Sequence, residues 1–246
     1  MASETSINRG RGAEVFLYTG QERNAIARDV IRVRFGPSVT AIPHYAFFDC
    51  RKLEEVELCE GLQEIGDSAF YDCRALKHFT IPSTVRRIGG LVFYQTPLRS
   101  LRLPDGVESI GEYDSAFYDC RALKRFTIPS TVIRIGEFAF AFVRSTLSIH
   151  LPDGVESIGE YAFCVGKFPH FRIPSLITTI SQGMFCGCEF LFSLELPEGT
   201  REIEADAFSL CHSLRNVAIP PNAGTEEDSF KSSTDLQQLF GSEVQI

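Results

Sequence analysis

Residues 116–140 read AFYDCRALKRFTIPSTVIRIGEFAF, a stretch that begins and ends on the same Ala-Phe dipeptide, 23 residues apart. Inside it, Phe126 and Ile128 alternate with polar residues and stop at Pro129, a pattern typical of a short β-strand that ends at a proline. A second apolar pair and a glycine turn follow before the next Ala-Phe. One such unit cannot bury its apolar side alone, so the stretch predicts a stack of similar units.

The same unit recurs along most of the chain. A phenylalanine returns every 22 to 24 residues, at Phe47, Phe70, Phe93, Phe117, Phe140, Phe163, Phe185, Phe208 and Phe230. An isoleucine stands five residues before most of these positions, and a leucine about six residues after most of them. Self-similarity at a fixed period of this length indicates a solenoid. We therefore predict a β-rich solenoid of nine repeats, each about 23 residues long.

Each repeat predicts the same local structure. The alternating apolar pair forms one strand of a single parallel sheet, and the segment that ends in Ala-Phe forms a short helical or 3-10 turn that places phenylalanine in the core. Nine strands spaced by about 4.8 Å would give a stack on the order of 40 Å long. Stacked arrays need covered ends, so both ends are expected to be capped.

This pattern divides the chain into four segments. Residues 1–12 are polar and predict a flexible N-terminal tail, and residues 13–29 predict an N-terminal cap. Residues 30–230 hold the repeats. Residues 231–246 contain a short apolar periodicity between possible N-capping residues and a glycine, which predicts a C-terminal cap helix followed by a tail.

A family resemblance rests on these repeats. The residues AFYDCRALKHFTIP at 69–82 and IPSTVRRIGG at 81–90 resemble the BspA-like (Treponema pallidum type) leucine-rich repeat, in which an Ala-Phe-x-x-Cys-x-x-Leu core recurs every 23 residues. The resemblance covers residues 29–230, and the leader at 14–20 is similar to the start of many such proteins expanded in diatoms. It implies a leucine-rich-repeat solenoid with a concave sheet face, used for protein–protein contact, and no shared catalytic residues.

Composition narrows the class of protein. The chain is 44% hydrophobic and 23% charged, which is ordinary for a folded protein, and its formal net charge of −8 disfavours nucleic acid and anionic lipid as partners. It has no run of 18 apolar residues, so no membrane span is predicted. The first 12 residues lack the apolar segment of a secretory signal, which favours an intracellular location in cytoplasm or nucleus.

Cysteines keep the register of the repeat. Five of the eight lie three residues after a repeat phenylalanine, at Cys50, Cys73, Cys120, Cys188 and Cys211. A position held by the repeat is a packing position, so these residues predict a structural ladder of buried thiols. Metal or redox use is the weaker alternative, because the Cys186-Gly187-Cys188 pair has no second pair at zinc-ligand spacing. No cofactor and no metal site is therefore predicted.

The sequence gives no sign of catalysis. None of the five histidines lies in a hydrolase or metalloprotease motif, and no phosphate-binding glycine loop is present. Without a nucleophile, base and stabiliser in one pattern, we predict that the chain is not an enzyme.

Outward strand positions offer a candidate binding surface. Between Glu57 and Ser193 these positions carry no acid, although the chain as a whole is acidic. The predicted partner-binding residues are His78, Thr80, Arg102, Arg125, Thr127, His150, His170 and Arg172. An ordinary solvated strand face would also tolerate these residues. The functional alternative is an acidic protein surface held by arginines, with histidines that strengthen binding as the pH falls toward 6.

The leading functional prediction is a non-catalytic scaffold that binds a protein partner through the concave sheet face. One alternative is a structural subunit of a larger assembly. Another is a secreted or surface adhesin whose signal peptide is missing from this chain, since bacterial members of the resembling family are often secreted. The pattern favours neither a monomer nor an oligomer.

Overall fold

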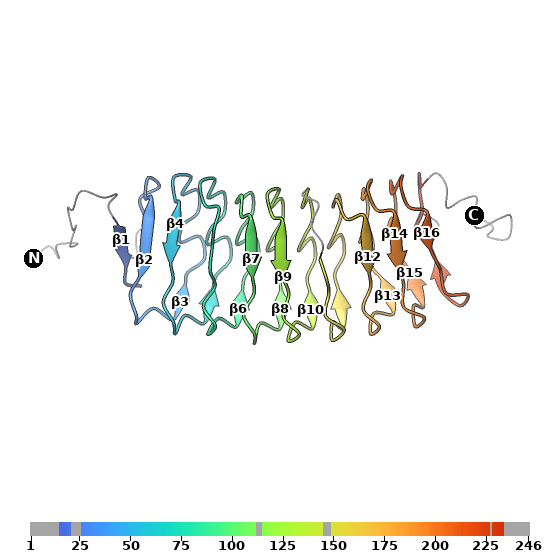
Figure 1. Cartoon of the computed structure of the whole chain (residues 1–246), viewed down its shortest axis with the longest axis horizontal. Coiled ribbons are helices and arrows are strands. Elements are labelled where there is room, and N and C mark those ends of the chain that lie inside the picture. The colour runs from blue at the N-terminus through green and yellow to red at the C-terminus, as the bar shows by residue number, and fades with distance from the viewer. Residues whose placement is uncertain (1–14, 21–25, 112–114, 145–148, 227, 234–246) are drawn as a thin grey trace, which may run out of the picture.

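The computed structural model describes residues 15–20, 26–111, 115–144, 149–226 and 228–233. Figure 1 shows a stack of similar coils, with the first and the last described residues at opposite ends of the stack. Among the described residues there are strands, bridges and turns, and no helix. Most of the predicted C-terminal cap helix, and the predicted N-terminal tail, lie outside the described residues.

Most coils contribute a strand to a first row along one side of the stack. Its members are β1 (Val15–Tyr18), β2 (Arg32–Phe35), β4 (Glu55–Glu57), β7 (Ser100–Arg102), β9 (Arg125–Thr127), β12 (His170–Arg172), β14 (Ser193–Glu195) and β16 (Asn216–Val217). All pairings are parallel and join neighbouring coils. Between β4 and β7 the row thins to a single bridge from His78 to Ser100, and it breaks again between β9 and β12.

A second row of two-residue strands runs along another side of the stack (Figure 1). It comprises β3 (Ala41–Ile42), β5 (Glu64–Ile65), β6 (Arg87–Ile88), β8 (Ser109–Ile110), β10 (Arg134–Ile135), β11 (Ser157–Ile158), β13 (Thr179–Ile180), β15 (Glu202–Ile203) and β17 (Gly224–Thr225). In eight of these strands the second residue is a buried isoleucine. The sequence predicts one parallel sheet, and the structure adds this second row.

Paired turns form the third side of each coil, where the sequence predicts short helical or 3-10 turns. Tyr45 and Asp49 have positive φ angles of 60° and 61°, which no regular helix contains. Their N–H groups therefore point to the next coil: that of Tyr45 donates to the Asp67 carbonyl (2.8 Å) and that of Asp49 to the Tyr71 carbonyl (2.9 Å). The turns thus stack by hydrogen bonds between coils, as the strands do.

The core is a column of phenylalanine rings along the axis. The rings of the nine repeat phenylalanines stack on one another with centroids 5.2 to 6.0 Å apart. The eight from Phe47 to Phe208 are fully buried. At the N-terminal end, β1 adds a strand in parallel to β2, and the buried ring of Tyr18 lies 5.8 Å from Phe47. The first strand therefore covers the end of the column.

Candidate functional site

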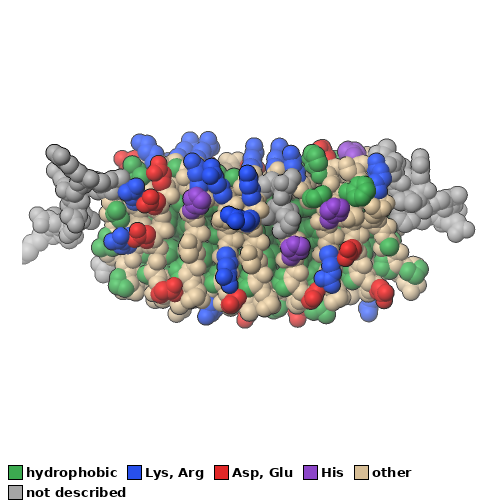
Figure 2. Space-filling model, in the orientation of Figure 1, with side chains coloured by type: hydrophobic (Ala, Val, Ile, Leu, Met, Phe, Trp, Pro, Cys, Tyr) green, Lys and Arg blue, Asp and Glu red, His purple; other side chains and the backbone are tan. Residues whose placement is uncertain are grey.

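The outward side of the first row is the candidate site, and we call it the sheet face. It consists of the exposed residues of the first-row strands, of segments 78–80 and 149–151, and of the described positions directly before them. All eight residues that the sequence predicts to bind a partner are exposed on it: His78, Thr80, Arg102, Arg125, Thr127, His150, His170 and Arg172. Figure 2 shows this face, with cationic side chains gathered over its middle and acidic side chains beside cations toward both ends.

Arginines near the N-terminal end of the sheet face are paired with acids on the next coil. The ion pair Arg32–Glu55 measures 3.1 Å and Arg34–Glu57 measures 2.5 Å. The hydrogen bond from Arg34 lowers the pKa of the Glu57 carboxyl. These arginines are therefore neutralised within the chain.

Arg172, near the C-terminal end, is also paired. Its guanidinium lies 2.9 Å from Asp153 and 3.9 Å from Glu195. Asp153 belongs to a turn rather than to a strand, so it is not among the outward strand positions. The predicted stripe from His78 to Arg172 is therefore not uniformly basic.

The unpaired cations lie in three consecutive coils at the middle of the face. We call this cluster the basic centre, and it consists of Lys77, His78, Arg99, Arg102, Lys124 and Arg125. Each of these side chains is exposed. Among the residues that the structure describes, none of the five lysines and arginines forms an ion pair. The sheet face thus holds free positive charge only over its middle strands, as far as the described residues show.

Register between coils explains why these cations cluster. Lys77, Arg99 and Lys124 each stand directly before the strand segment of their coil. The N–H of Arg99 donates to the Lys77 carbonyl (3.0 Å), and the N–H of Lys124 donates to the Arg99 carbonyl (2.9 Å). The three residues therefore form a column beside the strands, which we call the flank column. Alternation along the strands does not mark these positions, although the repeat spacing already aligns them.

The remaining predicted residues surround the basic centre. Thr127 is the register partner of Arg102, and Thr80 lies on the coil before β7. His170 places its Nδ1 atom 2.6 Å from the Ser193 hydroxyl oxygen, and His150 is exposed one coil before β12. Both histidines lie on the C-terminal side of the basic centre.

The turn side of the stack carries a different charge pattern, which we call the turn-face ladder. Arg74 holds Asp72 with two hydrogen bonds of 2.6 and 3.1 Å, and Arg51 from the preceding coil reaches Asp72 at 3.1 Å. Arg121 holds Asp119 in the same way, at 2.6 and 3.0 Å. The side chains of Asp72 and Asp119 are only 6% and 5% exposed. Arg74 and Arg121 thus bind the aspartate of their own coil, whereas Arg51 binds the aspartate of the neighbouring coil.

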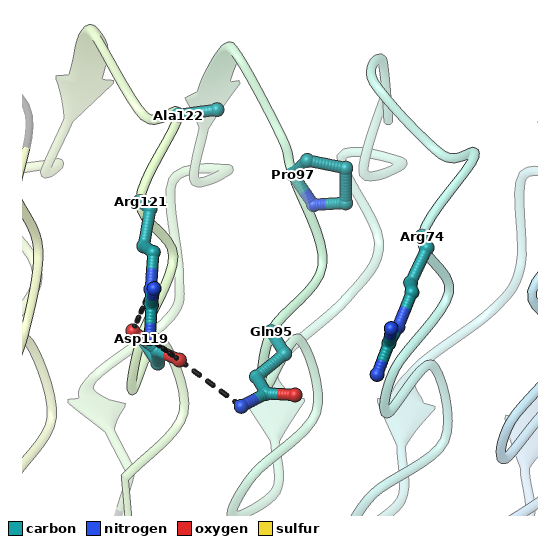
Figure 3. A pocket seen from close by; sticks show the side chains of 6 residues that line it. All are labelled: Arg74, Gln95, Pro97, Asp119, Arg121 and Ala122. Atoms are coloured by element: carbon teal, nitrogen blue, oxygen red, sulfur yellow. Dashed lines mark hydrogen bonds and ion pairs between the residues drawn. The ribbon is translucent and has the colours of Figure 1, made fainter.

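One coil interrupts the ladder and leaves a shallow depression. Gln95 and Pro97 stand where neighbouring coils have the aspartate and the arginine. Figure 3 shows the resulting depression of about 420 Å³, in which the Gln95 amide donates to Asp119 (3.1 Å) between Arg74 and Arg121. Both arginines that line it are already engaged with their aspartates, so the depression is a gap in a structural ladder.

The five in-register cysteines are all buried beneath the turns, and all eight cysteines are free thiols. The Cys73 thiol donates to the Phe47 carbonyl (3.3 Å), and the Cys120 thiol donates to the Phe93 carbonyl (3.1 Å). Burial raises the pKa of Cys50 to about 11. The thiols of Cys73 and Cys120 therefore bind the backbone of another coil, and burial makes all five in-register thiols poor nucleophiles at neutral pH.

The described ranges hold neither a cluster of metal-ligating side chains nor a membrane-spanning helix. No group of three His, Cys, Asp or Glu side chains there is placed to hold a metal ion. No helix long and apolar enough to cross a membrane occurs in the same ranges.

Comparison with known proteins agrees with the fold. Residues 29–114 and 113–237 match the family model of the BspA type leucine-rich repeat region. A leucine-rich repeat protein from Bacteroides ovatus is 21% identical with a TM-score of 0.57, and the match covers 84% of this chain and 65% of that one. The Treponema pallidum leucine-rich repeat protein is 22% identical with a TM-score of 0.52, over 82% and 83% of the two chains.

A third similar structure is the pneumococcal vaccine antigen PcpA, 19% identical with a TM-score of 0.56 over 82% of this chain and 60% of that one. The chain therefore spans less than two thirds of both the Bacteroides and the pneumococcal structures. No curated protein sequence matches this chain significantly. At these identities the likeness concerns the fold.

Proposed function

Because the chain belongs to the BspA-type leucine-rich repeat family, whose members are generally non-enzymatic, we propose that it is a non-catalytic binding module. Its partner is a protein with an acidic surface, and the basic centre of the sheet face holds that surface. The unpaired charge of the basic centre supports this proposal. On the same face Arg32, Arg34 and Arg172 all have carboxylates of this chain beside them.

The chemistry of the basic centre favours carboxylates. Guanidinium groups bind carboxylates through paired hydrogen bonds, and Arg102 and Arg125 extend from neighbouring strands with those donors exposed. The chain carries a formal net charge of −8, so a local basic cluster orients an acidic partner toward one face. The rigid stack keeps the spacing of these cations fixed, which lowers the entropy cost of binding.

The test measures binding of a fluorescein-labelled 12-residue oligoglutamate to the full chain by fluorescence anisotropy at low salt. The test variant combines Arg102→Glu, Lys124→Glu and Arg125→Glu. We expect its affinity to fall at least about tenfold, because three attractive contacts become repulsive.

A matched control combines Arg86→Glu, Arg134→Glu and Arg201→Glu, three exposed arginines outside the sheet face. Both variants have the same net charge. We expect the control to keep most of the affinity. Equal loss in both variants would show that only net charge matters, and absence of oligoglutamate binding by the unmodified chain would contradict an acidic partner.

A further inference from the structure

Two cysteines on the turn side stand outside the ladder of buried thiols. Cys164 and Cys186 each follow a repeat phenylalanine directly, on neighbouring coils, whereas the in-register cysteines stand three residues after one. Cys186 is partly exposed, and Cys164 is 5% exposed. These two residues, which we call the outer pair, therefore lie nearer to solvent than the thiols of the ladder.

Backbone hydrogen bonds hold the outer pair side by side. The N–H of Phe163 donates to the Met184 carbonyl (3.0 Å), and the N–H of Val165 donates to the Cys186 carbonyl (2.8 Å). These two bonds join the coils on both sides of Cys164. Segments joined in this way lie about 4.8 Å apart, and disulfides usually join Cα atoms about 4.4 to 6.8 Å apart. The backbone therefore brings the outer pair within reach of a disulfide.

Aromatic residues at the same position of other coils show how side chains lie there. Phe48, Tyr71 and Tyr94 each follow a repeat phenylalanine directly, as the outer pair does. Their rings stack from coil to coil, with centroids 4.6 and 4.4 Å apart. Side chains at this position therefore point the same way and lie alongside those of the next coil. Two thiols placed there meet by rotation about their Cα–Cβ bonds.

The thiols of the outer pair are not engaged with the backbone as those of the ladder are. The Cys188 thiol donates to the Phe163 carbonyl (3.2 Å), and the Cys211 thiol donates to the Phe185 carbonyl (3.1 Å). Among the residues that the structure describes, neither thiol of the outer pair donates such a bond. Cys188 and Cys211 also stand in register on neighbouring coils, so they provide an internal comparison.

We propose that Cys164 and Cys186 form a reversible disulfide that staples the coil of β12 to the coil of β14, two neighbouring strands in Figure 1. The oxidant is a small-molecule disulfide such as oxidised glutathione. This inference does not depend on the proposed function.

The reaction proceeds by two thiol–disulfide exchanges. The thiolate of Cys186, the more exposed residue, attacks one sulfur of oxidised glutathione, which forms a mixed disulfide and releases one glutathione thiolate. The Cys164 thiolate then attacks Sγ of Cys186, which forms the bond between the coils and releases the second glutathione thiolate. The two cysteines thus lose two electrons and two protons, and oxidised glutathione takes them up to become two thiols.

The pH sets the rate of this exchange, because the thiolate is the attacking form. Burial raises the pKa of Cys186, and burial together with the neighbouring Cys186 thiol raises the pKa of Cys164 to about 12. The exchange is therefore slow at pH 7. It should run at least about tenfold faster at pH 8.5, where more thiolate is present.

The test incubates the folded full chain with oxidised glutathione at pH 8.5 and then blocks free thiols with N-ethylmaleimide in guanidinium chloride. All but two of the eight cysteines should carry the maleimide. Digestion without reduction, followed by mass spectrometry, should find Cys164 joined to Cys186. We expect this link at least about tenfold above any link between Cys188 and Cys211, because burial protects the ladder.

Cys186 and Cys188 lie on one tryptic peptide, so fragmentation of the linked peptide and two variants separate them. Cys186→Ala should abolish the link to Cys164, and the matched Cys188→Ala should keep it. A lasting glutathione adduct at Cys186 without the second exchange would overturn the proposal. A link between Cys188 and Cys211 in equal yield would also overturn it, because the reaction would then be that of unfolded chains.

Thermal denaturation measures the staple itself. The disulfide restricts the unfolded chain, so it should raise the thermal midpoint by about 5 °C, and dithiothreitol should reverse the shift. Cys186→Ala, treated with oxidised glutathione in the same way, is the control and should show no such shift. An unchanged midpoint in the cross-linked protein would overturn the stapling of the two coils.

Discussion

Arginines on the turn side and on the sheet face of this solenoid have opposite surroundings, although the same repeat places both. On the turn side, Arg74 and Arg121 each donate hydrogen bonds to a nearly buried aspartate two residues earlier in their own coil. On the sheet face, Arg102 and Arg125 extend from neighbouring strands with no ion pair among the described residues. Stacking alone therefore does not decide what an arginine does. An arginine is paired where an acid stands at the matching position of the same or the next coil.

This difference separates charge that stabilises from charge that is free to bind. A carboxylate nearly removed from water depends on its arginine, so loss of either group costs stability. An exposed arginine without a partner contributes little to folding. The turn side should therefore respond to substitution by unfolding, and the sheet face by loss of affinity.

The largest expected effect is Asp72→Ala on the turn side. The variant loses the contacts with Arg74 and Arg51, and it places alanine at a φ of 54°, which aspartate tolerates better. We expect the free energy of unfolding to fall by roughly 2–4 kcal/mol, measured by urea denaturation.

The matched control for that substitution is Asp105→Ala, an exposed aspartate that forms no ion pair with the described residues. A change of less than about 0.5 kcal/mol is expected there. If Asp72→Ala were as mild as the control, the turn-face ladder would not stabilise the stack.

The next largest effect is expected from alkaline pH, which should lower the stability of the turn side through the buried thiols. Burial raises the pKa of Cys211 to about 12, above the value near 8.5 of an exposed thiol. The protonated thiol is the form that folding favours, so this stability is fully present below about pH 8.5 and is lost as the pH rises toward 12. We expect a loss on the order of 3 kcal/mol from this residue by pH 11.

Thermal denaturation at a series of pH values measures this loss, with Cys211→Ala as the comparison. The alanine variant is less stable at neutral pH but should lose less stability between pH 8.5 and 11. Parallel curves for the two proteins would show that the thiol does not contribute to alkaline unfolding.

Salt should weaken binding by the sheet face and leave the stability of the turn side nearly unchanged. This effect is smaller than the two above. The basic centre is exposed, and raising the salt concentration from 50 to 500 mM shortens the screening length severalfold, so oligoglutamate affinity should fall about tenfold or more. The nearly buried aspartates of the turn side are screened less, so the thermal midpoint should change little. Anisotropy and thermal denaturation in the same buffers compare the two. Affinity that is insensitive to salt would contradict binding through the basic centre.

The sequence predicts the coils because their markers are local. The repeat phenylalanines and the prolines after most apolar pairs fix the period and the parallel stacking, and the core column follows from them. The turns are different: positive φ angles occur at Phe138 and Phe142, a residue type that gives no sign of that conformation. Hydrogen bonds between neighbouring coils impose it, and those bonds exist only in the stack.

The candidate site is predicted in part for a similar reason. Alternation along the strands identifies Arg102 and Arg125 as outward, because side-chain direction in a strand follows sequence spacing. Neutralisation of Arg172 depends on Asp153, which a turn brings into reach from 19 residues away. The residues of the flank column stand outside the alternating positions, so only alignment of whole coils brings them together.

The smallest predicted effect comes from repairing the interrupted coil. Gln95→Asp alone removes the hydrogen bond to Asp119 and puts two carboxylates on neighbouring coils, so it should destabilise the fold slightly. Pro97→Arg alone supplies a cation without its own aspartate. Together they restore the pattern of Asp72 and Arg74, so the double variant should be more stable than the sum of the single changes by about 0.5–1 kcal/mol. Urea denaturation of the four proteins gives this coupling energy. Additive effects would mean that the ladder's arginines act through their bulk rather than their charge, and the contrast between the two sides would then lose its electrostatic basis.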